Sequence, residues 1–149
     1  MIVTELDTAQ VQALLANNRL GRLACTQDDQ PYVVPITFSY SGVYLYSLSM
    51  LGQKIDWMRS NPKVCVQVDE FTHGREWKSV VVYGTYEELP EKIGFKHERE
   101  RAWSLLSQHP NWWEPGSLKP IVPPPAEISS HLFYRIIIKT MTGRQAIDV

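Results

Sequence analysis

The chain lacks the features that mark several large classes of protein. Its 149 residues include only two cysteines, Cys25 and Cys65. No apolar run reaches the roughly 18 residues that a membrane-spanning helix needs, and the first residues lack the basic region and hydrophobic core of a secretory signal. The net charge is −1 and the basic residues are scattered, which argues against a nucleic-acid partner. We therefore expect a soluble, cytoplasmic protein without membrane contact, in which both cysteines stay reduced.

Several chemical signatures are missing as well. No two of the four histidines have the spacing of metal ligands, and neither cysteine lies near one, so we expect no metal site. The Gly-x-Ser-x-Gly elbow of serine hydrolases is absent. The acidic pair at 87–88 is more typical of a solvated strand end than of an acid–base couple. The residues themselves therefore identify no catalytic side chain.

Short runs of apolar and β-branched residues, separated by turn residues, occur throughout the sequence. These runs predict six strands, at residues 23–26, 32–40, 43–46, 64–68, 77–86 and 131–141. Helices are expected at residues 8–18, from about residue 53 to Asn61-Pro62, and within 90–109. A turn, Thr142-Gly143-Arg144, is expected after the last strand.

This pattern predicts one mainly β domain over residues 1–149, with accessory helices. Short links favour antiparallel pairing, and a small closed or nearly closed barrel leaves few strand edges unpaired. A doubly wound parallel sheet fits poorly, because it needs a crossover helix after nearly every strand and usually carries a glycine fingerprint. The prediction is therefore a six-stranded antiparallel barrel.

A strand runs directly into a helix within residues 44–59, and the junction has the chemistry of an anion site. Ser47, Ser49, Gly52 and Lys54 supply two hydroxyls, a flexible backbone unit and a cation. The first N–H groups of a helix are unpaired and carry partial positive charge, so a lysine in the first turn is unfavourable unless an anion binds there. The junction therefore predicts a phosphate site. The alternative is that a serine caps the helix and Lys54 is a solvated surface lysine.

Pro35 interrupts the strand expected at 32–40. Proline cannot donate a hydrogen bond to a sheet, so it belongs at an edge, a bulge or a break in pairing. The residues that follow, Ile36, Thr37 and Phe38, could then offer backbone groups to the hydrogen-bonding edge of a planar heterocycle. The alternative is an ordinary edge strand.

Residues 111–130 form a long irregular stretch with five of the ten prolines and the pair Trp112-Trp113. Such a length is unusual for a loop in a compact domain. We therefore expect a binding or interface role for this stretch instead of mere connection.

Four motifs follow one another along the chain: Leu-Gly-Arg-Leu-Ala-Cys at 20–25, Pro-Tyr-Val-Val-Pro-Ile-Thr-Phe at 31–38, Leu-Tyr-Ser-x-Ser-x-x-Gly-x-Lys at 45–54 and Trp-x-Ser-Val-Val-Val-x-Gly at 77–84. In this order they resemble the flavin-binding split-barrel proteins related to pyridoxamine 5'-phosphate oxidase. The resemblance is greatest to the branch that includes nitroimidazole-resistance proteins, which residues 111–116 and 142–144 also resemble. It covers nearly the whole chain.

This resemblance implies a homodimer of six-stranded split barrels that holds one FMN in each of two clefts between the subunits. It implies that Lys54, with the hydroxyls of Ser47 and Ser49, holds the FMN phosphate, and that residues 35–38 line the isoalloxazine ring. It also implies that Arg144 reaches over from the partner subunit. The cofactor-binding residues expected on this basis are Pro35, Ile36, Thr37, Phe38, Tyr46, Ser47, Ser49, Gly52, Lys54, Trp77, Ser79, Val80 and Arg144.

The function that the resemblance implies is an FMN-dependent oxidoreductase. We expect electrons to pass from a nicotinamide donor through FMN to a small flat acceptor, such as a nitroaromatic or a free flavin, beside Trp112 and Trp113. FMN is expected over FAD, because one phosphate site is visible and nothing resembles an adenine pocket. Pyridoxamine 5'-phosphate oxidase-like activity is an alternative, but the oxidase has an arginine just before its serine-x-lysine motif and this chain does not. Non-catalytic flavin storage or sensing is a second alternative, and a pocket for a deazaflavin or haem is a third.

Overall fold

The structure is a computed structural model that describes residues 1–109, 111–113 and 131–148. Its strands are β1 (Ile2–Glu5), β2 (Leu20–Gln27), β3 (Gln30–Thr37), β4 (Ser39–Tyr40), β5 (Tyr44–Met50), β6 (Lys63–Phe71), β7 (Trp77–Leu89) and β8 (His131–Ile147). Its helices are α1 (Thr8–Ala16), α2 (Gln53–Ser60), the short 3-10 helix η1 (Ile93–Phe95) and α3 (Lys96–Leu106). Within the described ranges, no helix is both long enough and apolar enough to cross a membrane. Most of the irregular stretch expected after α3 lies outside the described residues.

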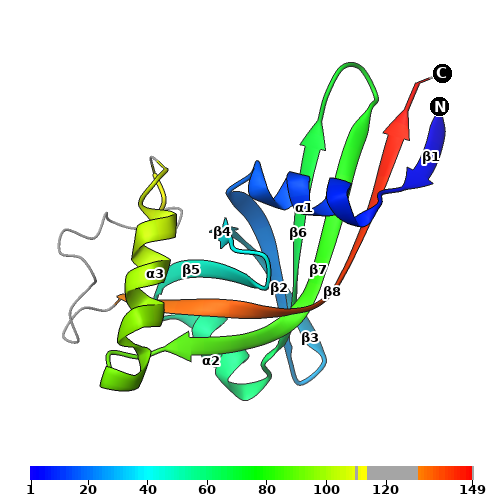
Figure 1. The fold of residues 1–149 in the computed structure, drawn as a ribbon. Helices are drawn as coiled ribbons and strands as arrows, with labels where there is room; N and C mark the ends of the chain where they lie inside the picture. Colours follow the sequence, from blue (N-terminus) through cyan, green and yellow to red (C-terminus); the bar gives the residue numbers. More distant parts are fainter. Residues whose placement is uncertain (110, 114–130, 149) are drawn as a thin grey trace.

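All the strands belong to one antiparallel sheet. Its order is β3-β2-β6-β7-β8-β5-β4, and β1 pairs with the far end of β8. The long strands β7 and β8 bend along their length, so the sheet curls around a core instead of lying flat (Figure 1). The predicted mainly β, antiparallel architecture with accessory helices is confirmed.

The number of strands differs from the prediction, because the sheet contains eight in the described part of the chain. Strand β1 was not predicted. The strand expected at 32–40 divides into β3 and β4, since Phe38 leaves the ladder and its N–H donates to the carbonyl of Arg19 at 2.8 Å. Pro35 lies on β3, which is at one end of the sheet order and pairs only with β2 among the described strands. Of the edge, bulge or break in pairing expected for this proline, the structure shows an edge strand with an unbroken register to β2, which was the simpler alternative.

The turn predicted at residues 142–144 is wrong, because these residues lie inside β8 and pair with β7. Gly143 has a different reason to be glycine. A Cβ added there would lie 2.9 Å from Cδ1 of Leu6 and 3.0 Å from Cγ2 of Val11. The glycine therefore lets the segment at the start of α1 pack closely on the sheet, and it does not reverse the chain.

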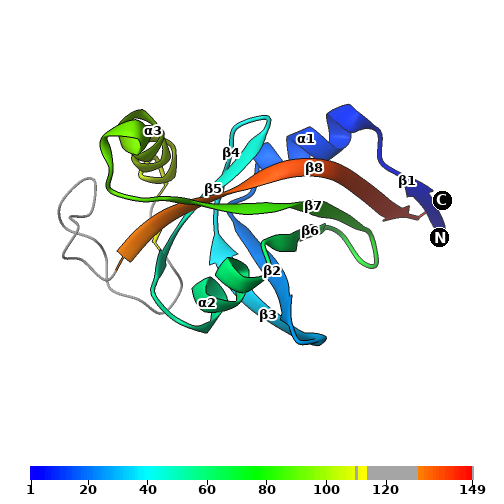
Figure 2. The ribbon, with the colours of Figure 1, turned by 90° about the horizontal axis from the view of Figure 1, so that it is seen from below.

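The helices lie at three separate places around the sheet (Figure 2). Helix α1 begins with a capping box, in which Asp7 and Gln10 each accept a hydrogen bond from the other's backbone N–H. Its buried residues join the larger core, which fills the barrel. A second, smaller core lies where α3 covers β5 and β8, and it contains Tyr46, Leu48, Leu89, Ala102, Leu106, Trp112 and Phe133.

Candidate functional site

Helix α2 begins with a turn that carries a buried cation. Its N-cap is Gly52, which extends no side chain to the first N–H groups. Lys54, the second residue of the helix, is only 7% exposed. The simpler interpretation of this junction is therefore wrong in both parts: a glycine and not a serine is the N-cap, and Lys54 is not a solvated surface lysine.

A pocket of about 250 Å³ opens beside this turn. It is bordered by Tyr32, Val34 and Pro35 of β3 and by Met50, Gly52 and Lys54 of the β5–α2 junction. A Cβ added at Gly52 would meet no atom of the described residues within 4 Å, so the helix start faces open space. Helix N–H groups and a lysine together form a donor set that suits a phosphate.

Ser47 and Ser49 lie inside β5 and are almost fully buried. The hydroxyl of Ser47 donates to the carbonyl of Thr37 at 2.7 Å, and the hydroxyl of Ser49 donates to the carbonyl of Met50 at 2.7 Å. Neither serine is among the residues that border the pocket beside Lys54. Both hydroxyl protons are committed within the chain, and a role for these serines toward phosphate stays a prediction.

The residues expected to line a ring alternate between two faces of β3. Pro35 is exposed and borders the pocket. Ile36 and Phe38 are buried in the barrel core. Thr37 is buried as well, and its hydroxyl donates to two backbone carbonyls of the segment after α3. Pro35 is thus the one of the four whose side chain borders the pocket as described.

Tyr46 and Val80 are fully buried, each in a different core. The Tyr46 hydroxyl donates to Oε2 of Glu98 in α3 at 3.3 Å, and burial raises the pKa of this phenol. The Val80 side chain packs inside the barrel. Any contact of these two residues with a ligand would therefore have to come from their backbone atoms.

A second pocket, of about 500 Å³, brings three of the other candidates together. Trp77 and Ser79 share one face of β7, Arg144 pairs with Ser79 from β8, and Glu5 of β1 pairs with Arg144. All four residues border this pocket. The Ser79 hydroxyl also accepts a hydrogen bond from Nε2 of Gln67 at 3.0 Å, which fixes its position. The sequence did not indicate Glu5, because β1 was not predicted.

The two pockets lie in different parts of the chain. They share no lining residue among those described. One pocket is beside α2 and the other is where β1 joins the end of β8, and these places are far apart in both ribbon views (Figures 1 and 2). The resemblance implied that both sets of residues surround one cleft between two subunits, with Arg144 supplied by the partner subunit. A single chain does not bring Lys54 and Arg144 together.

An apolar row crosses the outer face of four neighbouring strands. Its members are successive cross-strand partners: Val33 of β3, Ala24 of β2, Cys65 of β6 and Tyr83 of β7. Val33 is 61% exposed and Tyr83 is 49% exposed. By strand alternation, Pro35 and Ser79 lie on the same face as this row.

The fold defines the class of protein first: a mainly β, antiparallel split barrel with accessory helices. The family follows from the sequence, because residues 7–145 match the family model described as pyridoxamine 5'-phosphate oxidase. The chain belongs to this family.

Several relatives are similar over nearly the whole chain. An uncharacterized protein of Rhizobium meliloti (strain 1021) is 54% identical over 98% of this chain and 97% of its own length. The crystal structure of an FAD-binding protein from Mesorhizobium loti is 52% identical, covers 99% of this chain and 100% of that one, and has a TM-score of 0.82. A candidate 5-nitroimidazole antibiotic resistance protein from Bacteroides thetaiotaomicron is 18% identical over 97% of this chain and 87% of that one, with a TM-score of 0.74. At this identity the last comparison shows the fold alone.

Proposed function

We propose that this protein binds a flavin and uses it to pass electrons from a nicotinamide donor to a small flat acceptor. One observation carries the proposal: Lys54 is buried in the first turn of α2, beside an open pocket. A lysine at this position adds positive charge to the positive end of a helix, and a flavin phosphate supplies the opposite charge. The name of the Mesorhizobium loti relative, an FAD-binding protein, supports a flavin as the ligand.

In this proposal the chain's own residues bind and orient the cofactor. Lys54 and the first N–H groups of α2 hold a phosphate through charge-assisted hydrogen bonds, which are about twice as strong as neutral ones. The strand that contains Pro35 lines the ring. A bound flavin supplies the electron-transfer chemistry itself. This division of labour explains why the sequence shows no acid–base pair.

FMN is the first candidate for the cofactor, because FMN has a single phosphate and Lys54 is the one cation among the described residues that border this pocket. FAD is the second candidate, and the 52% identical FAD-binding relative favours it. Heat denaturation of the purified holoprotein, followed by chromatography of the released flavin, distinguishes them. Released FMN supports the first candidate, and released FAD supports the second.

We further propose that the flavin lies between two copies of the chain. The pockets with Lys54 and with Arg144 are separate in one chain, and the apolar row of Val33 and Tyr83 lies on the same sheet face as Pro35 and Ser79, which border one pocket each. A second copy on this face would place its Arg144 pocket near the first copy's Lys54. Sedimentation equilibrium of the wild-type protein and of Tyr83→Glu tests this. A monomer that retains its flavin would contradict it.

A matched pair of lysine substitutions tests the phosphate site. We expect Lys54→Ala to weaken flavin binding roughly 10- to 100-fold, since a hydrogen bond to a charged group contributes about 1.5–3 kcal/mol. Lys96→Ala is the control, because Lys96 is also in the first turn of a helix but is exposed. Flavin content after dialysis is the measurement. Equal retention by the two variants would contradict the assignment of Lys54.

Anaerobic reduction separates an enzyme from a binding module. We expect NADH or NADPH to bleach the flavin absorbance of the holoprotein, and a nitroaromatic or free flavin to restore it. Absence of bleaching with either donor would favour flavin storage or sensing. Turnover of pyridoxamine 5'-phosphate would instead favour vitamin B6 oxidation. A visible spectrum of haem or deazaflavin in the purified protein would overturn the flavin proposal.

A further inference from the structure

We propose that Thr37 is a positioning residue, whose hydroxyl fixes the segment of Trp112 and Trp113 as a wall beside the ring-lining strand. This wall sets which flat acceptors fit. The inference rests on the proposed function for its consequence, the choice of acceptor. Its structural part rests on the contacts of Thr37 alone.

The Thr37 hydroxyl contacts two carbonyl oxygens of the segment after α3, which share its one proton. Its Oγ1 lies 2.7 Å from the carbonyl oxygen of Trp112 and 3.0 Å from that of Trp113. The backbone carbonyl of Thr37 in turn accepts the hydroxyl of Ser47 at 2.7 Å. Two residues that the resemblance assigned to the cofactor therefore hold other parts of this chain: Ser47 binds the backbone of Thr37, and the Thr37 side chain binds the tryptophan segment.

The backbone turn at Asn111 and the packing of Trp112 and Trp113 hold the tryptophan segment beside this hydroxyl. Asn111 has a φ of +56°, a left-handed conformation that asparagine tolerates better than most residues. Trp112 is buried in the second core, with its ring centroid 4.9 Å from that of Trp103 in α3. Trp113 packs edge-on against Trp112 at 6.5 Å and is only half-buried. The second core therefore buries Trp112, and Trp113 packs against that core while remaining partly exposed.

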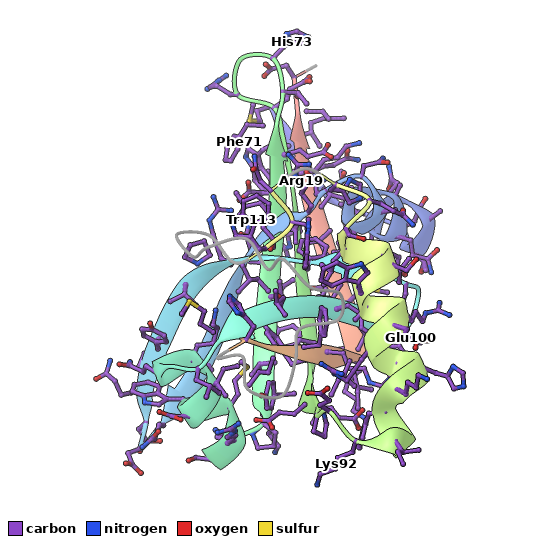
Figure 3. All side chains as sticks on the ribbon, turned by 90° about the vertical axis from the view of Figure 1, so that its left-hand side faces the viewer. Arg19, Phe71, His73, Lys92, Glu100 and Trp113 are labelled. Atoms are coloured by element: carbon purple, nitrogen blue, oxygen red, sulfur yellow. The ribbon has the colours of Figure 1, made fainter. Side chains whose placement is uncertain are left out.

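Thr37 lies on the same strand as Pro35, which borders the pocket beside Lys54. Pro35 and Thr37 are two residues apart on β3, so their side chains share a face and their Cα atoms are separated by roughly 7 Å. Pro35 borders the pocket, whereas Thr37 is covered by the tryptophan segment. Trp113 and Arg19 are both labelled in Figure 3, and the carbonyl of Arg19 accepts a hydrogen bond from the N–H of Phe38, the residue after Thr37. In this proposal, a planar ring that lies over Pro35 has the tryptophan segment at its edge.

Thr37 can hold the wall only through its hydroxyl. Valine has the same shape but no donor, so Thr37→Val leaves two carbonyls without this hydrogen bond. Serine keeps the donor and loses only a methyl group, so Thr37→Ser should restore the contact. Thr85→Val in β7 is the matched control, because it removes a half-buried threonine hydroxyl from another part of the sheet.

The first experiment needs no flavin. Protein labelled with 5-fluorotryptophan gives one ¹⁹F signal for each tryptophan, and Trp→Phe variants assign them. We expect Thr37→Val to shift or broaden the Trp113 signal, while Thr37→Ser and Thr85→Val leave it in place. An unchanged Trp113 signal in a folded Thr37→Val protein would overturn the positioning role.

The second experiment uses the holoprotein and two acceptors of different size, a mononitrobenzene and free riboflavin. We expect Thr37→Val to change the ratio of their kcat/KM values by about tenfold, the effect of one lost apolar contact in a pocket. Thr37→Ser should return the ratio to the wild-type value. A ratio that stays constant while the Trp113 signal moves would overturn the role in acceptor choice.

A substitution in the wall itself covers the case in which Thr37→Val does not fold. Trp113→Leu changes a half-buried side chain and should alter the acceptor ratio in the same direction. An unaltered ratio in this variant would overturn the proposal. If the wild-type protein transfers no electrons, the proposed function fails and the role in acceptor choice fails with it. The ¹⁹F spectra would still decide the positioning role on their own.

Discussion

Helices α2 and α3 begin in the same way but have different surroundings. Each has a lysine in its first turn, and the N-cap residue of each, Gly52 or Phe95, makes no side-chain cap bond among the described residues. Lys96 of α3 is exposed, whereas Lys54 of α2 is buried. A lysine at a helix start is therefore weak evidence for a ligand by itself.

The difference lies in what each helix start contacts. Each first turn contains one acidic residue, Asp56 in α2 and Glu98 in α3. Glu98 accepts a hydrogen bond from Nη1 of Arg135 at 2.8 Å, which ties α3 to β8. The pocket beside α3, of about 300 Å³, is lined by Glu91 and Glu100 as well as by basic residues. The pocket beside α2 is bordered by Lys54 and by no acidic residue of the described chain. We infer that the start of α3 has a structural role and the start of α2 a binding role.

The largest expected effect is the loss of stability when the ion pairs that tie the start of α3 to β8 are removed. Arg135 is nearly buried, contacts Glu87 through Nε at 2.7 Å and also binds Glu98. We expect Arg135→Met to lower the free energy of unfolding by about 2–3 kcal/mol, less than for a fully buried pair because both carboxylates are partly exposed. Urea denaturation measures this. The exposed pair of Arg75 and Asp148, broken by Arg75→Met, should cost about 0.5 kcal/mol or less, and an equal cost for both variants would contradict the structural role.

The next effect is the stabilisation of the protein by flavin bound at the start of α2. Flavin at 100 times its Kd should raise the free energy of unfolding by about 2.7 kcal/mol in the wild-type protein, because a ligand that binds only the folded state stabilises it. In Lys54→Met the gain should shrink by about 1.4 kcal/mol for each tenfold loss of affinity. Thermal denaturation with and without flavin measures the difference. A full gain in Lys54→Met, or a reduced one in Lys96→Met, would remove the distinction between the two helix starts.

Signals within a few residues of sequence predicted the junction between β5 and α2 well. The strand-to-helix junction at 44–59 combines a run of apolar residues, a glycine and a lysine, and each of these acts within a few residues of sequence. The capping pattern at Asp7 and Gln10 also depends on neighbours only, and helix α1 begins where it indicates. The burial of Lys54 is a tertiary fact, and the sequence left it open.

Features that depend on distant contacts could not be predicted. The sequence alone suggests that Gly143 is a turn residue, whereas the structure shows that Leu6 and Val11 pack closely against it. The hydroxyl of Thr37 meets carbonyls 75 and 76 residues away, and no local pattern announces that contact. Tyr46 fits a cofactor motif by spacing, yet its strand turns it into the core under α3. Alternation along a strand could have separated inward from outward side chains once the strand bounds were known.

Two glycines provide a smaller test. Gly143→Ala forces a Cβ to within 3.0 Å of two apolar side chains, and we expect it to cost about 1–2 kcal/mol of unfolding free energy. Gly52→Ala places its Cβ in open space at an extended φ of 173°, so the apoprotein should lose about 0.5 kcal/mol or less. Urea denaturation of the apoproteins compares them. Weaker flavin binding by Gly52→Ala would show that the ligand uses this space, and a large loss of apoprotein stability would show that the space is not open.

The smallest effect uses Cys25 as a reporter of the charge on Lys54. Burial raises the pKa of the Cys25 thiol above its ordinary value of 9.0, and the positive charge of Lys54 lowers it in part. The protonated thiol is favoured in the folded state, so its contribution to stability is complete below about pH 9 and is lost as the pH rises through the folded-state pKa.

Removal of the Lys54 charge should therefore raise the Cys25 pKa further. Ultraviolet titration of the thiolate in a Cys65→Ser background, which leaves one thiol, measures it. We expect an upward shift in Lys54→Met and none in Lys96→Met. Binding of a phosphate at Lys54 should act in the same direction, because it neutralises the same charge. If neither Lys54→Met nor added flavin changes the Cys25 pKa, the charge of Lys54 does not act at the pocket. The distinction between the starts of α2 and α3 would then fail.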